Sequence, residues 1–309
     1  MSTSTLWIRN LETLSRTRGI AMTMALCCLL VMPSGPAEAE GVQQEAAKEV
    51  VEDQEALAEA EGKDAEAAAL AKAVQNPLAS LITLPMQANF NDGAGPYDRR
   101  IFNLNIQPVI PITGEKWNII TRTIIPINSV PVGETDSEFG IGDTSLSLFW
   151  SPAKPSSLTW GIGPAFTLPT ASNPELLGSG KYSLGPTGVV FYGVGKWTMG
   201  IVASNVWSVG GDSDRDDVNF FFAQYFVNYN FGHGWAIGSA PIITCDWEAE
   251  TGSGDQCTIP FGLQISKVSH LGSRPVNFLL GYYENVQHPD GAPESQVRFQ
   301  VNFMFPQKK

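Results

Sequence analysis

Amide and hydroxyl side chains recur at every second residue in several segments of this 309-residue sequence. Asn103, Asn105 and Gln107 form one such series, and Asn118 with Arg122 belongs to another. Because successive side chains of a β-strand point to opposite faces, each series would line one face of a strand. Amides and hydroxyls offer hydrogen bonds, so this face suits reversible contact with small neutral or weakly polar solutes.

One face of the predicted strands thus carries the candidates for contact with a solute. These candidates are Asn103, Asn105, Gln107, Asn118, Arg122, Asp143, Gln224, Asn228, Asn277, Tyr283, Arg298, Gln300 and Asn302. The set is rich in amides and poor in charge, whereas an ion-selective channel would show rings of charges of one sign. An alternative stays open for each residue, because polar side chains also fill a wet interior without touching a solute.

Arg122 and Arg298 are the cations of this set. A buried cation needs a carboxylate partner, since an unpaired charge is costly away from water. Asp143 is the nearest candidate partner for Arg122 in the predicted arrangement. Such an ion pair would either narrow a path for solutes or hold neighbouring strands together.

The three histidines of the sequence give little support for catalysis. His233 and His270 fall in predicted short turns, and His288 falls in a predicted long loop. Nucleophilic catalysis would need a histidine within a strand, beside a serine, at the outer end of the protein. A lipid-modifying enzyme is therefore a weaker interpretation of the sequence than a protein that contacts small solutes. Its catalytic histidine would be His288. The sequence predicts no catalytic residue, no metal site and no cofactor.

Two of the four cysteines lie in an N-terminal segment with the layout of a signal peptide. Three arginines precede an apolar run from Ile20 to Met32, and Ala37-Glu38-Ala39 offers a cleavage site. Residues 1–39 are therefore predicted to be removed during export. The remaining Cys245 and Cys257 flank one predicted loop. Export to an oxidising compartment predicts a disulfide between them, and two unpaired thiols are the alternative.

From Leu78 onward the sequence alternates between apolar and polar residues, most clearly from Val297 to Phe305. Alternation with a period of two predicts strands that have one apolar face. The predicted strands are 79–90, 101–111, 117–127, 141–150, 158–168, 183–192, 197–208, 218–230, 235–246, 257–267, 275–286 and 296–305. No run of about 18 apolar residues occurs, so the sequence holds no candidate transmembrane helix.

The connections between these strands alternate between long and short. The long ones cover 91–100, 128–140, 169–182, 209–217, 247–256 and 287–294, and the short ones cover 112–116, 151–157, 193–196, 231–234 and 268–274. Short periplasmic turns opposite long outer loops are typical of up-and-down membrane barrels. Tryptophans flank both kinds of connection, as expected for two girdles at the membrane surfaces. The sequence therefore predicts an all-β fold: a transmembrane, antiparallel β-barrel of about 12 strands over residues 77–309, in the outer membrane of a Gram-negative bacterium.

Residues 40–76 form an Ala/Glu-rich segment between the signal peptide and the barrel. Residues 40–75 hold ten acidic residues against three lysines, which contributes −7 to the formal net charge of −12. Such an acidic chain is a poor partner for nucleic acid. We expect a solvated periplasmic helix or a half-disordered linker here. The alternative is a helix that enters the barrel mouth or pairs as a short coiled coil.

The predicted fifth strand contains Gly161 and Gly163. Glycine inside a strand often marks a place where another part of the chain approaches closely. The segment that approaches would be the acidic helix or the loop at 169–182.

Several segments of the sequence resemble one known family. They are Gln107–Pro111, Trp117–Pro126, Gly142-Asp143, Leu168–Ala171, Gly178–Lys181, Asn205–Trp207 and Arg298–Val301. Through them, over roughly residues 75–306, the sequence resembles bacterial outer-membrane proteins grouped with the phenol meta-cleavage pathway. The resemblance implies a barrel that moves small, often aromatic or hydrophobic, compounds. It brings no catalytic residues.

The resulting hypothesis is a passive conduit for small molecules. A structural or adhesive barrel without transport is the alternative from another class. The expected partners are outer-membrane lipid, an unidentified small solute and the barrel-assembly machinery during biogenesis.

Overall fold

The structure, a computed structural model, describes residues 36–154, 156–249 and 256–305. Residues 1–35, which carry most of the predicted signal peptide, lie outside the described residues. The chain divides into two compact units, residues 1–60 and 61–309. Helix α2 (Pro36–Gln75) begins in the first unit and ends in the second. In the part of the chain that the structure describes, no helix is both long and apolar enough to cross a membrane.

Helix α2 accounts for the acidic segment. Its alanines, glutamates, glutamines and lysines have high intrinsic helix propensity. The helix ends at Gln75 because Pro77 has no backbone N–H and disfavours helical geometry in the residue before it. The side chain of Asn76 then accepts a hydrogen bond from the backbone N–H of Leu78 at 3.0 Å, which turns the chain toward the first strand.

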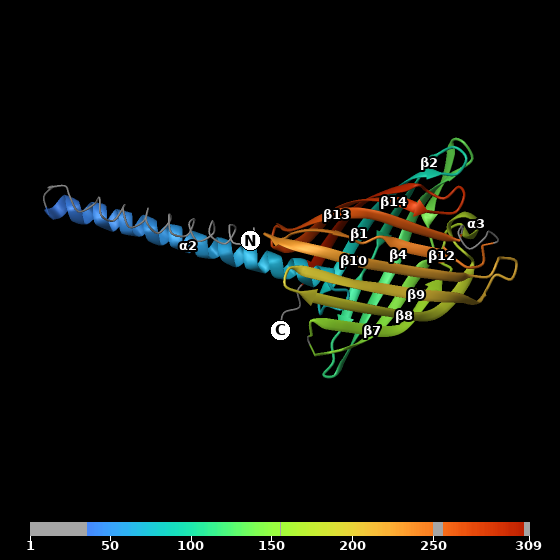
Figure 1. Ribbon diagram of the computed structural model, residues 1–309, viewed down its shortest axis with the longest axis horizontal. Coiled ribbons are helices and arrows are strands. Elements are labelled where there is room, and N and C mark those ends of the chain that lie inside the picture. The colour runs from blue at the N-terminus through green and yellow to red at the C-terminus, as the bar shows by residue number, and fades with distance from the viewer. Residues whose placement is uncertain (1–35, 155, 250–255, 306–309) are drawn as a thin grey trace, which may run out of the picture. The chain divides into compact units, whose positions relative to one another are not determined.

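The second unit is a closed antiparallel barrel (Figure 1). Its strands are β1 (Ile82–Ala94), β2 (Arg99–Ile106), β3 (Val109–Ile112), β4 (Trp117–Val132), β5 (Asp136–Ile141), β6 (Thr144–Pro152), β7 (Leu158–Leu168), β8 (Lys181–Val194), β9 (Trp197–Gly211), β10 (Asn219–Gly232), β11 (Trp235–Ser239), β12 (Ile242–Asp246), β13 (Cys257–Leu271), β14 (Arg274–Gln287) and β15 (Ser295–Phe305). The first strand pairs with the last, from Ile82 opposite Phe305 to Asp92 opposite Ser295, and this pairing closes the barrel. Closure leaves no edge with unpaired backbone groups, as hydrocarbon requires.

The fifteen segments make twelve barrel strands, as the sequence predicts. Three of the twelve are interrupted: β2 and β3, β5 and β6, and β11 and β12 are each two parts of one strand. Two breaks fall at Pro108 and Pro241, which have no N–H to donate to the ladder. The third falls at Gly142-Asp143. At these breaks backbone groups become free for contacts other than strand pairing.

Two of the predicted long loops are largely strand. β1 and β2 leave only residues 95–98 as a turn, and β4 and β5 leave only 133–135. The expectation of loops at 91–100 and 128–140 was therefore too long. Arg99 ties these two hairpins together, since its guanidinium donates to the backbone oxygens of Gly133 and Thr135 at 3.2 and 3.3 Å.

The outward faces of the strands are apolar in the middle and aromatic near the ends. Ile162, Phe261 and Leu263 are at least 60% exposed although they lie within strands. At the end with the short turns, the exposed rings of Trp117 and Trp160 meet edge to face at 6.1 Å. Such an arrangement fits lipid around the waist and amphipathic rings at the headgroup level.

Two apolar clusters lie inside the barrel. The larger comprises Leu78, Ile120, Phe149, Val189, Phe191, Val202, Phe226 and Ala240. The smaller comprises Ala71, Leu81, Val268 and Met304, with Leu70, Ala73, Val74 and Ala79 packed against it. Both clusters contain residues from the segment that links α2 to β1. That segment therefore lies within the barrel.

Candidate functional site: a cavity inside the barrel

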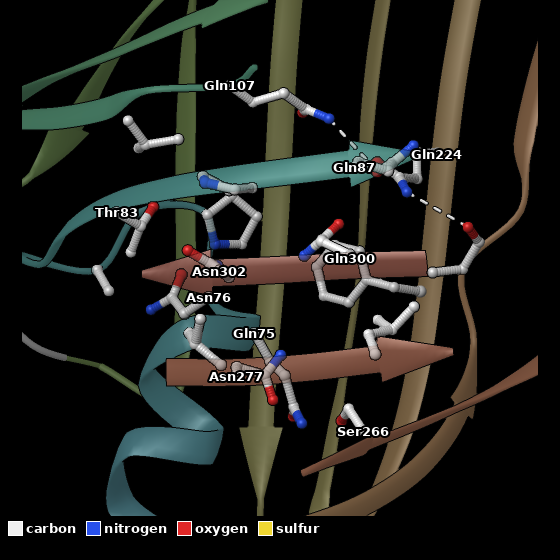
Figure 2. A pocket seen from close by; sticks show the side chains of 18 of the residues that line it. Gln75, Asn76, Thr83, Gln87, Gln107, Gln224, Ser266, Asn277, Gln300 and Asn302 are labelled. Carbon is white, nitrogen blue, oxygen red and sulfur yellow. Dashed lines mark hydrogen bonds between the residues drawn. The ribbon is translucent and has the colours of Figure 1, made fainter. Parts of the chain in front are cut away.

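A cavity of about 190 Å³ lies inside the barrel, next to the end of α2. Side chains from the strands and from residues 73–85 surround it. Figure 2 shows Gln75 and Asn76 at the end of the helix, with Asn277, Gln300 and Asn302 from the strands turned toward the same space. Because the sheet closes around it, this cavity is the candidate site for a solute.

The end of α2 occupies the mouth of the barrel at the side of the short turns. We call residues 70–81 the mouth segment. Gln75 accepts a hydrogen bond from the Thr198 hydroxyl at 2.5 Å and donates to the side-chain oxygen of Asn230 at 3.1 Å. On the helix turns just before, Asp64 Oδ2 lies 2.6 Å from His233 Nδ1 in one of the short turns. The expectation of a wholly solvated helix is therefore wrong for these last turns, and the alternative, entry into the mouth, is what the structure shows.

The close approach predicted at Gly161 is present, but the approaching residue, Leu78, follows the end of α2 and belongs neither to the helix nor to the loop at 169–182. A methyl group at Gly161 would lie 3.1 Å from Leu78 Cδ2 and 3.2 Å from Phe149 Cβ. The absence of a side chain at residue 161 therefore lets the mouth segment reach the barrel wall. Gly163 has a different neighbour, since a methyl group there would overlap the backbone oxygen of Leu148 on the adjacent strand.

One side of the interior is a polar wall built by β13, β14, β15, β1 and β2. Gln87 donates to Asn89 at 3.1 Å and accepts from Gln107 at 3.4 Å, the latter drawn as a dashed line in Figure 2. The series continues away from the cavity, because Asn89 donates to Asn103 at 2.9 Å. Asn103 in turn donates to Asn105 and to Asn128, at 3.2 and 2.7 Å.

The opposite side is an apolar wall. It consists of the larger interior cluster, with Ile120 on β4, Phe149 on β6, Val202 on β9 and Phe226 on β10. Phe149, Val202 and Phe226 also line the cavity. The interior is therefore amphipathic, with amides facing hydrocarbon across one small space.

Arg122 does not pair with Asp143, so that prediction was wrong. The guanidinium of Arg122 donates to Gln107 Oε1 at 2.8 Å and lies 6.0 Å from the ring centre of Phe222. Asp143 instead accepts hydrogen bonds from the backbone N–H of Ser179 at 2.7 Å and of Ala171 at 3.2 Å. Asp143 sits where β5 gives way to β6, and the backbone turn there directs its carboxylate to the loop that carries α3 (Pro174–Leu177).

Arg298 also lacks the expected carboxylate. It is 2% exposed, and its Nη1 donates to the backbone oxygen of Ala240 at 2.8 Å, while Nη2 donates to Gln296 at 2.8 Å. Its guanidinium lies 4.6 Å from the ring centre of Tyr283. The break between β11 and β12 makes this contact possible, because it turns the backbone of Ala240 away from strand pairing.

The structure brings eight of the thirteen sequence candidates together at the cavity. They are Gln107, Arg122, Gln224, Asn228, Asn277, Arg298, Gln300 and Asn302. Asn103, Asn105 and Tyr283 belong to the surrounding networks, and the Tyr283 hydroxyl donates to Gln264 at 2.8 Å. Asn118 is bound to the turn at Gly114, and Asp143 is bound to the α3 loop, so both lie outside the cavity lining.

The sequence did not predict the apolar wall, and it predicted entry of the helix into the mouth only as the alternative. Phe149 follows Ser147 by two residues, so the same alternation that places Ser147 inward also places Phe149 inward. The inward set was selected for polarity, and this selection removed the aromatic and aliphatic residues. The mouth segment left a weaker signal in the sequence, namely the glycine at residue 161.

The three histidines and the described cysteines, Cys245 and Cys257, are not among the residues that line the cavity. His288 Nδ1 lies 3.1 Å from the backbone oxygen of Pro289. No cluster of three or more His, Cys, Asp or Glu side chains suited to a metal ion occurs within the described ranges. Cys245 and Cys257 face each other across β12 and β13 and form the predicted disulfide.

Residues 107–252 match the family model described as "Putative MetA-pathway of phenol degradation". The match confirms the resemblance predicted from the sequence. A comparison with curated protein sequences gives no match.

Solved structures with a similar fold are outer-membrane barrels. An outer-membrane channel from Pseudomonas putida F1 has a TM-score of 0.52 and 16% identity, over 73% of this chain and 94% of that chain. The NanC porin has a TM-score of 0.46 and 9% identity, over 72% and 100%. The outer-membrane phospholipase A from Escherichia coli has a TM-score of 0.41 and 11% identity, over 74% and 97%. The likeness to the Pseudomonas putida channel shows the fold. Together with the apolar outward faces of the strands, this fold indicates a location in the bacterial outer membrane.

Proposed function

We propose that the protein is a passive outer-membrane channel for small solutes whose surfaces are partly apolar. The observation that carries this proposal is the cavity, enclosed by a continuous sheet and lined by amides on one side and by Phe149, Val202 and Phe226 on the other. A solute with polar and apolar faces can exchange water for hydrogen bonds on one wall and for apolar contacts on the opposite wall.

The comparisons support the same proposal. The family description refers to phenol degradation, and the first structural relative is called an outer-membrane channel. A phenol carries a hydroxyl on an apolar ring, so its chemistry matches an interior with two unlike walls. Outer-membrane lipid would surround the barrel, and the barrel-assembly machinery would insert it.

Conductance across a planar lipid bilayer tests the proposal directly. The refolded protein should show discrete openings, and Arg122→Ala should change their conductance because Arg122 lines the cavity. Arg100→Ala is the matched control, since Arg100 lies at the rim, paired with Asp92 at 2.6 Å and 60% exposed in its side chain. A barrel that shows no openings, and through which no solute enters liposomes, would contradict the proposal.

The mouth segment favours one alternative, a structural barrel with no continuous path. Its hydrogen bonds to Thr198 and Asn230 hold the end of α2 in the mouth. Uptake assays separate the two functions, since a structural barrel would leave solute entry unchanged when the protein is absent. An outer-membrane lipid hydrolase would instead lose lipid turnover on His288→Ala, and an unchanged rate would exclude that role for His288.

A further inference from the structure

We propose that the cavity binds a small organic anion, with its negative charge attracted by the two lining cations Arg122 and Arg298 and its apolar body against Phe149, Val202 and Phe226. This inference rests on the proposed channel function and names the class of solute that the channel would take.

The charge of the cavity lining has one sign. Arg122 and Arg298 are its charged residues, and its remaining lining side chains are amides, hydroxyls and apolar groups. Among the described residues, neither arginine has a carboxylate oxygen within salt-bridge distance. Arg298 is buried and Arg122 is half-buried, and cations held in an enclosed space without a counter-ion are costly, so a bound anion would lower that cost.

Both arginines keep hydrogen-bond donors for a ligand. A guanidinium has five N–H donors. With the described part of the chain, Arg122 makes one hydrogen bond, to Gln107. Arg298 makes three, to Asn89, Ala240 and Gln296. Four donors of Arg122 and two of Arg298 therefore remain for a carboxylate, which accepts such paired donors well.

A series of three amides joins the two arginines. Gln107 accepts from Arg122 and donates to Gln87, and Gln87 donates to Asn89. Asn89 also accepts from Arg298 Nε at 3.4 Å. The side-chain oxygens of Gln107 and Asn89, which face the two guanidiniums, are therefore already hydrogen-bonded. Neutral amides in this arrangement fix the positions of the cations and leave their net charge uncompensated.

Asn302 adds an independent sign of a missing ligand. It lines the cavity and is 4% exposed, and its side-chain oxygen has no hydrogen-bond partner among the described residues. A buried polar atom without a partner is rare and costly. Rotation of the amide by 180° would present its N–H₂ group instead, which could donate to an anion in the cavity.

The apolar wall decides between kinds of anion. An inorganic anion needs polar contacts on all sides, whereas in this cavity Phe149, Val202 and Phe226 cover one side. The donors on the other side suit a single carboxylate. A ring or short chain that carries one carboxylate satisfies both walls, and an organic cation would meet two unpaired positive charges.

Binding of benzoate and of benzamide to the full-length protein in detergent tests the inference, because the two probes share a ring and differ in charge. Titration calorimetry should show saturable benzoate binding and at least about tenfold weaker benzamide binding. Arg122→Gln and Arg298→Gln should each weaken benzoate binding by about tenfold or more and leave benzamide unchanged. Arg100→Gln should leave the affinity for both probes unchanged. Arg298→Lys, which keeps the charge, should retain part of the benzoate affinity, and it replaces Arg298→Gln as the test variant where that variant does not fold.

The outcomes separate this inference from the proposed channel. Equal binding of benzoate and benzamide, or benzoate binding that persists in both glutamine variants, would overturn the anion site even if the protein conducts. Charge-dependent benzoate binding in a barrel without conductance would support the anion site and contradict the channel. Binding of chloride at the same affinity as benzoate would show that the apolar wall has no role, and would also overturn the inference.

Discussion

The hydroxyl of Thr198 on β9 donates a hydrogen bond of 2.5 Å to Gln75 Oε1 at the last residue of α2. Thr198 is 1% exposed, so this contact lies fully inside the barrel. Asn230 on β10 donates to the same oxygen at 3.1 Å. One side-chain amide thus fastens the mouth segment to two neighbouring strands. These hydrogen bonds, with the packing of Leu78 and Leu81 inside the barrel, hold the end of the helix in the mouth.

Gln75→Ala is expected to loosen the mouth segment and to raise the open time of the channel. The substitution removes the partner of Thr198 and of Asn230, and each lost hydrogen bond costs about 0.5–1.5 kcal/mol. Single-channel recording in planar bilayers measures the effect. Gln54→Ala is the matched control, because Gln54 is an exposed residue of the same helix. Identical gating in the two variants would show that Gln75 does not hold the mouth closed.

Gly161→Val is expected to displace the mouth segment by steric overlap with Leu78. A β-carbon at residue 161 already lies 3.1 Å from Leu78 Cδ2, and overpacking of this kind costs about 1–3 kcal/mol. The midpoint of heat unfolding, followed by gel mobility, should fall. Leu78→Ala in the same chain should recover part of the loss, because the two sites are in contact. Gly188→Ala, where the nearest atom is 3.8 Å away, should leave the midpoint unchanged.

The barrel could be predicted from the sequence because one physical rule governs every strand. Lipid outside and a polar interior force side chains to alternate, so residues as distant as Leu104 and Phe299 follow the same pattern. Strand ends were less predictable. Pairing of β4 with β5 continues to Val132 opposite Asp136, and alternation no longer marks a strand once both of its faces meet water.

The candidate site could be predicted only in part. Alternation correctly placed Gln107 and Arg298 inside, because direction follows from parity alone. The hydrogen-bond partners of an inward side chain depend on distances across the barrel. These distances are set by the stagger between strands and by the interruptions within them. Arg298 reaches Ala240 because strand pairing is interrupted there, between β11 and β12, and no local pattern in the sequence indicates that contact.

Leu263→Arg is expected to destabilise the folded barrel in lipid vesicles by about 2–4 kcal/mol, the cost of a cation at the middle of a bilayer. Leu263 lies in the middle of β13 and is 61% exposed on the outer face. Val286→Arg is the control, because Val286 is 66% exposed and next to the last residue of β14, where the cost falls to about 0–1 kcal/mol. Urea unfolding measures both. An equal loss of unfolding free energy in the two variants would contradict the placement of Leu263 at the middle of the bilayer and of Val286 near its surface.

The disulfide between Cys245 and Cys257 is expected to join β12 to β13 and to leave conductance unchanged. The two cysteines face each other across β12 and β13, twelve residues apart in sequence and away from the cavity. Reduction should shift gel mobility. Alkylation of either thiol before reduction would contradict the bond.

Asp143→Asn is expected to release the loop at 169–180 while the barrel stays folded. Asp143 Oδ2 accepts from the N–H of Ser179 at 2.7 Å and from its hydroxyl at 2.8 Å, and Oδ1 accepts from Ala171 N–H at 3.2 Å. The variant keeps one oxygen and replaces the other with a group that cannot accept. Since hydrogen bonds to a charged group contribute about 1.5–3 kcal/mol each, the loop should become sensitive to protease. Asp212→Asn, in an exposed turn with one bond to Asp214, is the control. Equal cleavage in the two variants would show that Asp143 does not anchor the α3 loop.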